Sequence, residues 1–209
     1  MDQGMIYIII AAVIGAGILI FGQFRKKKYQ EVEKDALQLA WERKDYHAYL
    51  GLLNEKIEKT SNKKEKNILA TLKMQAYISQ NQWPQMDALK KQVKTKELPK
   101  KIHLTFITQY IIGLCLSDRP EAALKWLEIE EPILKEAENS GTHKMYIGTL
   151  KGLKLFYTGH FKESEEQFTK LKNMKIAGDF YPPIFQDYLK RIEKEQQNQP
   201  QAAESATEN

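Results

Sequence analysis

The pattern of apolar and polar positions divides the chain into two parts. From Met5 to Phe24 there are 20 residues without a charged side chain, and eleven of them are Ile, Leu, Val or Phe. As a helix rising about 1.5 Å per residue, this run spans roughly 30 Å, which matches the hydrocarbon core of a bilayer. Because lipid offers the backbone no hydrogen-bond partners, the run is predicted to form a transmembrane helix.

Beyond Lys28 the pattern changes to that of amphipathic helices. Long stretches rich in Glu, Lys, Gln, Leu and Ala carry apolar residues at spacings of three and four. The single strand-like run, residues 102–112, has helical segments on both sides, so it is predicted to be a buried helix. The soluble part is therefore expected to be all-α.

Turn signals interrupt this pattern at regular intervals. Each is followed by a bulky or ring residue that opens another helix, and these four positions are separated by 37, 37 and 41 residues: Tyr46, Trp83, Pro120 and Phe161. Such a period indicates stacked helix–turn–helix units, because one helical hairpin cannot bury its own apolar face.

The fourth unit resembles the tetratricopeptide repeat around its inter-helix turn. Gly159-His160-Phe161 is followed by Ser164, Phe168 and Leu171. In that family, a Gly-x-aromatic turn precedes a small residue that lets two helices approach, and then an aromatic residue that packs inward. The corresponding residues after the other three turns are Tyr49 and Leu53, Met86, and Ala123 and Leu127.

The chain also departs from the family pattern. Tyr49 and Met86 replace the small residue in two units, only Pro99 approximates the closing proline, and the usual repeat has about 34 residues. The resemblance covers about residues 31–175. It implies a TPR-like α-solenoid of about four helical hairpins, and a plain helical bundle with coincidental turns is the alternative.

These observations predict five segments. Residues 1–4 form a short non-cytoplasmic tail, residues 5–24 the transmembrane helix, and residues 25–30 a basic juxtamembrane segment. Residues 31–195 form the repeat domain, with a capping helix from Ile184 to Glu195. Residues 196–209 lack large apolar side chains and are expected to be disordered.

The charges around the apolar run predict its orientation. The topology residues Arg25, Lys26, Lys27 and Lys28 follow the run directly, whereas Asp2 is the only charged side chain before it. This order argues against a cleaved signal peptide, which begins with positive charge. The positive-inside rule then predicts a single-pass protein with its N-terminus outside and its repeat domain in the cytoplasm. On one face of the helix, Ala11, Gly15 and Gly22 are candidates for pairing with another membrane helix.

The overall charge of +5 argues against a nucleic-acid partner. Beyond residue 28 there are 28 basic and 26 acidic residues, whereas a nucleic-acid module shows a much larger basic excess. The distribution is uneven, with ten lysines and three acids between Ser61 and Lys101. Those lysines face anionic lipid, receive an acidic partner, or form ordinary solvated helix faces.

No residue pattern indicates catalysis, a metal site, a cofactor or a small-molecule substrate. The four histidines have no paired spacing, and the better interpretation of His160 is that it forms a hairpin turn. Cys115, the single cysteine, lies in an apolar run and is expected to be a buried small hydrophobe.

The resemblance implies a protein-binding groove lined by the first helix of each hairpin. Its expected residues are Lys34, Gln38, Thr71, Gln75, Thr108, Tyr146 and Thr149. The resulting hypothesis is a membrane-anchored, non-catalytic scaffold that binds another protein at the cytoplasmic membrane face. The alternatives are a cell-envelope assembly or quality-control factor with an outward-facing domain, a module that binds anionic lipid, and an unrecognised enzyme.

Overall fold

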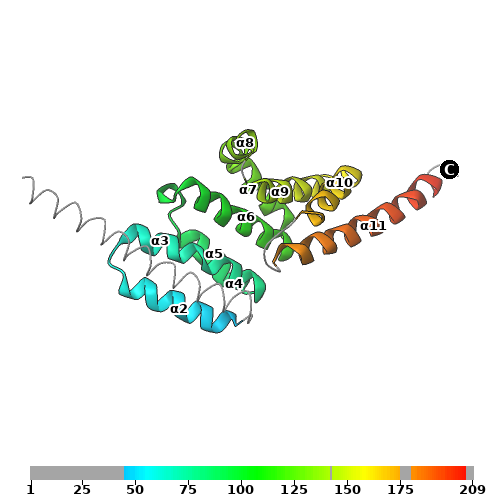
Figure 1. Ribbon diagram of the computed structural model, residues 1–209. Coiled ribbons are helices and arrows are strands. Elements are labelled where there is room, and N and C mark those ends of the chain that lie inside the picture. The colour runs from blue at the N-terminus through cyan, green and yellow to red at the C-terminus, as the bar shows by residue number, and fades with distance from the viewer. Residues whose placement is uncertain (1–44, 142, 175–179, 206–209) are drawn as a thin grey trace, which may run out of the picture. The chain divides into compact units, whose positions relative to one another are not determined.

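The computed structural model describes residues 45–141, 143–174 and 180–205, and side chains as far as residue 198. The chain divides into two compact units, residues 1–52 and residues 53–209. All regular structure in the described ranges is helical, which confirms the all-α prediction there (Figure 1). The elements are α2 (Tyr46–Lys59), α3 (Lys63–Thr71), α4 (Lys73–Ser79), α5 (Trp83–Gln92), the 3₁₀ turn η2 (Thr95–Glu97), α6 (Lys100–Leu116), α7 (Pro120–Ile129), α8 (Glu131–Asn139), α9 (Lys144–Tyr157), α10 (Phe161–Lys172) and α11 (Tyr181–Ser205).

None of the helices in these ranges is both long and apolar enough to span a bilayer. The predicted transmembrane run lies outside the described residues, and so do several residues to which a role was assigned. They are Ala11, Gly15, Gly22, Arg25, Lys26, Lys27, Lys28, Lys34 and Gln38.

The four predicted helix starts are confirmed. Tyr46, Trp83, Pro120 and Phe161 are the first residues of α2, α5, α7 and α10. Pro84 and Pro120 stand in the first turn of their helices, where a missing N–H costs no intrahelical hydrogen bond. Local turn chemistry therefore determines where these helices begin.

Three of the turns share one backbone geometry. The second residue after each preceding helix has a positive φ: 54° at Asn81, 58° at Asp118 and 79° at Gly159. The N–H of the following residue donates to the carbonyl five residues earlier, as a Schellman motif requires. These bonds are Gln82 to Tyr77 at 2.8 Å, Arg119 to Leu114 at 2.9 Å, and His160 to Leu155 at 2.9 Å. The hairpins α4–α5, α6–α7 and α9–α10 thus turn in the same way.

The shared turn geometry predicts how Gly159 tolerates substitution. Gly159→Ala should cost about 1–2 kcal/mol, because an alanine Cβ is strained at positive φ. Gly159→Asn should cost clearly less, since Asn81 holds the same position in another turn and asparagine tolerates this region. Urea unfolding of both variants, followed by circular dichroism, checks this, and equal losses would contradict it.

The α9–α10 hairpin closes on small residues, as the sequence predicts. The Ser164 hydroxyl donates to the Gly152 carbonyl at 2.9 Å, and Ser164 and Phe168 are completely buried. In the α4–α5 hairpin the larger Met86 is accommodated because α6 has Gly113 opposite it. A Cβ at Gly113 would lie 2.3 Å from the Met86 sulfur.

Helix α6 is the buried helix predicted for residues 102–112. Its side chains from Phe106 to Cys115 are all buried, because α4, α5, α7 and α9 contact it. Burial on every side explains why this segment lacks the amphipathic pattern of its neighbours.

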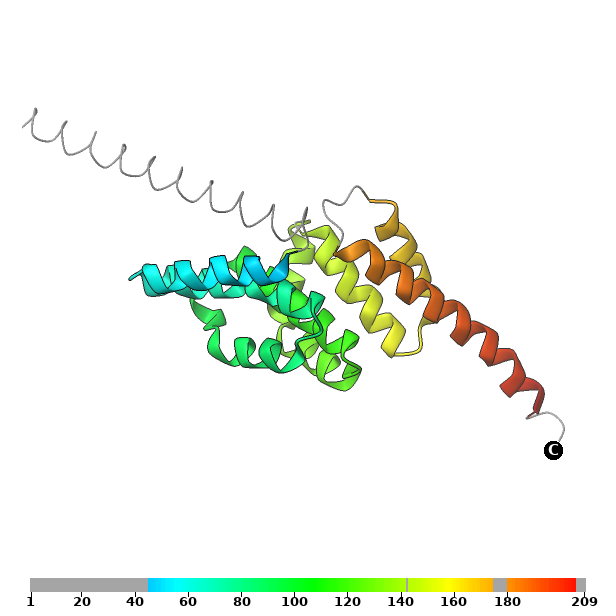
Figure 2. The same cartoon turned by 90° about the horizontal axis from the view of Figure 1, so that it is seen from below.

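Two features of the chain differ from the prediction. Helix α8 is an additional element, separated from α7 at Glu130 because Pro132 cannot stand inside a continuous helix. Helix α11 begins three residues before the predicted cap and continues to Ser205. Gln, Glu and Ala favour helix there, and the Gln196 amide donates to Glu165 at 3.1 Å. Figures 1 and 2 show the C-terminal end of α11 projecting beyond α10.

Candidate functional site

The three threonines predicted to line a groove are buried. Thr71 is 4% exposed, and Thr108 and Thr149 are fully buried. The hydroxyls of Thr71 and Thr149 donate to carbonyls of the preceding helical turn, at 2.7 and 2.8 Å. Each of these threonines stands ten residues before the positive-φ residue of a hairpin turn. Their burial shows that this position faces the packed interior. A buried side chain cannot contact a ligand in a groove, so the prediction that these threonines line a binding groove does not hold.

Among the predicted groove residues that the structure describes, Gln75 and Tyr146 keep accessible surface. The Gln75 side-chain oxygen accepts from Gln109 on α6 at 3.4 Å. The Tyr146 ring lies 6.0 Å from the His143 ring and 5.8 Å from the Tyr181 ring. We call the accessible side chains Gln75, His143 and Tyr146 the inner-helix surface.

Sequence reasoning missed Gln109, His143 and Tyr181. Tyr181 stands at the start of α11, three residues before the predicted start of the capping helix. Burial raises the pKa of Tyr181, and its hydroxyl has no hydrogen-bond partner in the described structure. Amide and aromatic side chains dominate the inner-helix surface, and such groups suit hydrogen bonding and packing with another polypeptide.

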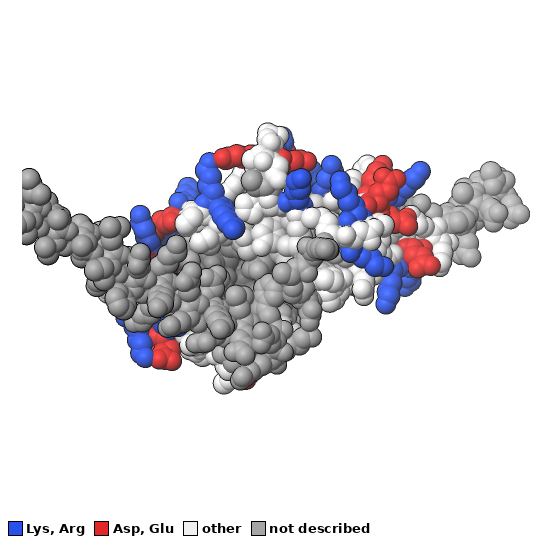
Figure 3. Space-filling view, viewed as in Figure 1, with Lys and Arg blue, Asp and Glu red and all other residues white. Residues whose placement is uncertain are grey.

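The uneven charge of the sequence is partly neutralised within the chain. Lys100 on α6 pairs with Glu136 on α8 at 2.6 Å, so a carboxylate of α8 contacts one end of the lysine-rich segment. Figure 3 shows lysines, arginines and carboxylates interspersed on one face of the molecule. The exposed Lys100–Glu136 pair contributes little stability by itself.

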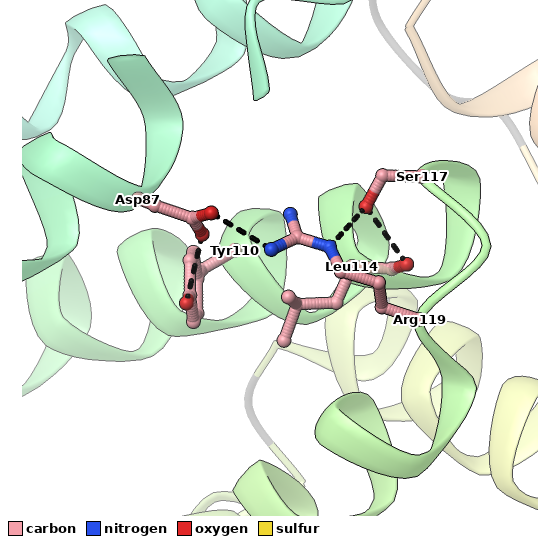
Figure 4. Close-up of polar contacts among 5 residues, drawn as sticks. All are labelled: Asp87, Tyr110, Leu114, Ser117 and Arg119. Atoms are coloured by element: carbon pink, nitrogen blue, oxygen red, sulfur yellow. Dashed lines mark hydrogen bonds and ion pairs between the residues drawn. The ribbon is translucent and has the colours of Figure 1, made fainter. Parts of the chain in front are cut away.

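A polar network joins the α4–α5 hairpin to the α6–α7 turn (Figure 4). The Asp87 carboxylate on α5 accepts from Arg119 Nη1 at 2.7 Å and from the Tyr110 hydroxyl at 3.1 Å. Arg119 Nε donates to the Ser117 hydroxyl at 2.8 Å, and that hydroxyl donates to the Leu114 carbonyl. The turn that ends α6 is thereby held against the outer helix of the preceding hairpin.

Aromatic contacts continue this junction. The Lys90 ammonium lies 4.0 Å from the Trp126 ring centroid, and the Trp126 and Tyr110 rings meet edge to face at 5.7 Å. Burial, with a smaller contribution from Asp87, raises the pKa of Tyr110 to about 12. Burial lowers the pKa of Lys90, and Glu130 opposes that shift. The phenol is therefore neutral at physiological pH, which lets it donate to Asp87.

Removing the guanidinium should loosen this junction only moderately. Arg119→Ala is expected to cost about 1 kcal/mol, because the two charged side chains are 36% and 31% exposed and water screens the pair. Tyr110→Phe should cost about 0.5–1.5 kcal/mol through one lost hydrogen bond. A double-mutant cycle between Asp87→Ala and Arg119→Ala measures the coupling directly. Strictly additive losses would contradict the network.

Cys115 is buried as the sequence predicted, and it faces two tyrosines. The Tyr157 and Tyr188 hydroxyls are 2.7 Å apart, and both interact with the thiol. Burial raises the pKa of Cys115 to about 12, although these hydroxyls act in the opposite direction. The thiol is thus held in its unreactive, protonated form.

Alkylation kinetics test this environment. With a pKa of about 12, only about one thiol in ten thousand is ionised at pH 8, against roughly a quarter for an ordinary cysteine. Native protein should therefore react with iodoacetamide very slowly at pH 8, and urea should restore ordinary reactivity. Fast labelling of the folded chain would contradict the buried position.

The histidines lie on separate elements. The His160 backbone and its Nδ1, 3.0 Å from the Thr158 hydroxyl, belong to the α9–α10 turn as predicted. His103 Nε2 lies 3.0 Å from Glu130 without hydrogen-bond geometry. Across the described ranges, no three His, Cys, Asp or Glu side chains converge as metal ligands. A pocket between α6 and α8 has a volume of only about 90 Å³, well below the roughly 300 Å³ of typical ligand sites.

Comparison of the chain with family models, curated proteins and solved structures finds no match.

Proposed function

We propose that this protein is a membrane-anchored, non-catalytic scaffold that binds another protein through its helical repeats at the cytoplasmic membrane face. The observation that carries the proposal is the turn geometry shared by three hairpins, with positive φ at Asn81, Asp118 and Gly159. Recurrence of one turn and one hairpin along the chain supports a TPR-like solenoid. Solenoids typically bind extended partners along the surface that their stacked helices create.

The inner-helix surface is the proposed contact for that partner. Gln75, whose side-chain oxygen accepts from the buried Gln109, offers an amide group that suits an extended peptide backbone. Tyr146, whose ring stacks on His143 and meets the Tyr181 ring at a tilt of 40°, offers an aromatic platform. This arrangement replaces the buried threonines as the proposed source of ligand contacts.

The predicted transmembrane run supports the anchoring part of the proposal. Confinement to the membrane raises the effective concentration of a membrane-bound partner without any new contact. Ala11, Gly15 and Gly22 remain the predicted face for pairing with another membrane helix.

Fractionation and a topology reporter test the anchor. The full chain should remain in the membrane pellet after alkaline carbonate extraction. Two reporters would be fused after Asn209 in turn, one that is active only in the cytoplasm and one that is active only after export. Only the cytoplasmic reporter should give a signal. Activity of an export-dependent reporter alone would overturn the cytoplasmic topology and favour an outward-facing assembly or quality-control factor.

Co-purification from native membranes tests the scaffold. The full chain carrying Gln75→Ala and Tyr146→Ala should lose a partner that the unaltered chain retains. The matched control carries Lys125→Ala and Glu165→Ala, two exposed positions on the outer helices α7 and α10. Equal recovery of the partner by both variants would reject the inner-helix surface as the binding site.

A further inference from the structure

Lysines gather at one end of the α3–α5 group, around the connection from α5 to α6. Asn67 joins α3 to the segment between α5 and η2. Its side-chain amide donates to the Lys94 carbonyl at 2.9 Å, and its side-chain oxygen accepts from the Lys94 N–H at 3.0 Å. The start of α3, the end of α5, η2 and the start of α6 therefore lie together. Figures 1 and 2 show this edge at the end of the α3–α5 group that is remote from the α4–α5 turn.

Eight lysines form what we call the lysine edge, against two glutamates, Glu65 and Glu97, on the same segments. They are Lys63, Lys64, Lys66, Lys91, Lys94, Lys96, Lys100 and Lys101. All except Lys66 are exposed. Lys94 pairs with Glu97 at 3.4 Å and Lys100 with Glu136, whereas Lys63, Lys64, Lys96 and Lys101 form no ion pair within the described part of the chain. The edge thus keeps a large positive excess.

The opposite edge lacks such a concentration of lysines. It consists of the hairpin turns around Asn81, Asp118 and Gly159. The only basic residue of these turns, Arg119, is paired with Asp87. The two edges of the repeats therefore differ in their lysine content, although the described chain as a whole mixes both signs.

The chemistry of the lysine edge suits anionic lipid better than an acidic peptide. The segment from residue 61 to 101 contains lysine but no arginine, and lysine is a flexible point charge without the fork that grips one carboxylate. The exposed large apolar residues of the described chain, Leu72, Ile129 and Met174, belong to none of the edge segments. A peptide site needs buried anchors, whereas a fluid layer of anionic headgroups needs only charge within a Debye length.

We propose that the lysine edge binds the anionic headgroups of the membrane in which the chain is anchored. The inference rests on the proposed anchoring, which keeps this edge within reach of the bilayer. Headgroup contact orients the repeats and leaves the inner-helix surface open to a protein partner.

Headgroup quenching in the reconstituted full chain tests the inference. A fluorophore on Lys96→Cys reports the lysine edge, and one on Gln85→Cys, an exposed residue beside the α4–α5 turn, reports the opposite edge. Vesicles contain headgroup spin-labelled lipid in phosphatidylcholine alone or with phosphatidylserine. We expect several-fold stronger quenching at Lys96→Cys when phosphatidylserine is present, and loss of that difference in high salt.

Charge-matched variants sharpen the test. Changing Lys63, Lys64, Lys100 and Lys101 to glutamine should abolish the phosphatidylserine effect. Changing four exposed lysines of α9 and α10 to glutamine, Lys151, Lys154, Lys162 and Lys170, removes the same charge and should leave the effect intact. Equal behaviour of the two variants, equal quenching in both lipids, or no quenching would overturn the inference.

Failure of the anchor gives a different result. A chain that does not float with the vesicles after carbonate washing defeats the proposed anchoring, whereas an inserted chain without quenching defeats only the lipid contact. If a photo-crosslinker at Lys96 captures a protein in native membranes while phosphatidylserine has no effect, the edge binds an acidic protein and the lipid assignment falls.

Discussion

Phe168→Ala is expected to destabilise the repeat domain by about 3–5 kcal/mol. Phe168 is completely buried, its ring stacks on Tyr188 at 5.3 Å, and it contacts Phe185 at 6.0 Å. Truncation leaves a cavity where α9, α10 and α11 meet, and close-packed aromatic neighbours cannot collapse fully into it. Urea unfolding of the full chain in detergent, followed by circular dichroism, measures the loss.

Phe161→Ala serves as the control for this prediction. Phe161 opens α10 and is only half-buried, with its ring 5.6 Å from Phe156. Its truncation should cost clearly less than that of Phe168. A Phe168→Ala variant as stable as the Phe161→Ala variant would show that α10 does not pack in this register.

Gly152→Ala is expected to cost about 1–3 kcal/mol, although alanine is the better helix former. A Cβ at Gly152 would lie 2.8 Å from Phe168 Cζ and 3.0 and 3.1 Å from two further atoms of the same ring. The ring is held by Tyr188 and Phe185 and has no room to move. In contrast, Gly51→Ala should stabilise by about 0.5–1 kcal/mol, because Gly51 is helical and its added Cβ meets nothing within 4 Å.

The double variant tests whether the close approach of Gly152 to Phe168 causes this loss. With Phe168 already changed to alanine, the Cβ at position 152 has free space, so Gly152→Ala should become neutral or stabilising. This reversal is a coupling between neighbours that a double-mutant cycle detects. A Gly152→Ala loss that is unchanged in the Phe168→Ala background would contradict the packing of α9 against α10.

Features governed by local chemistry were predictable from the sequence. The starts of α5, α7 and α10 follow from a polar or glycine turn and a bulky or ring residue, and these signals lie within a few residues of one another. The burial of α6 and of Cys115 follows from an uninterrupted apolar run. The inward positions of Ser164 and Phe168 follow from the resemblance of the fourth turn to a known repeat.

Features that depend on tertiary contacts were not predictable in this way. Thr71, Thr108 and Thr149 recur at one position, but the sequence does not show whether the recurring face packs or lies at the surface. The lysine edge joins two segments about 30 residues apart through Asn67 and Lys94, and no local pattern signals that pair. Helix α11 extends past residue 195 with the help of a contact from Gln196 to α10.

Site-specific photo-crosslinking in native membranes tests the scaffold proposal most directly. A benzophenone side chain would replace Gln75 or Tyr146 on the inner-helix surface, and Lys125 on α7 as the outer-face control. The scaffold proposal predicts one discrete crosslinked protein from both inner positions and none from the control. The same products at all three positions, or no product at either inner position, would contradict it.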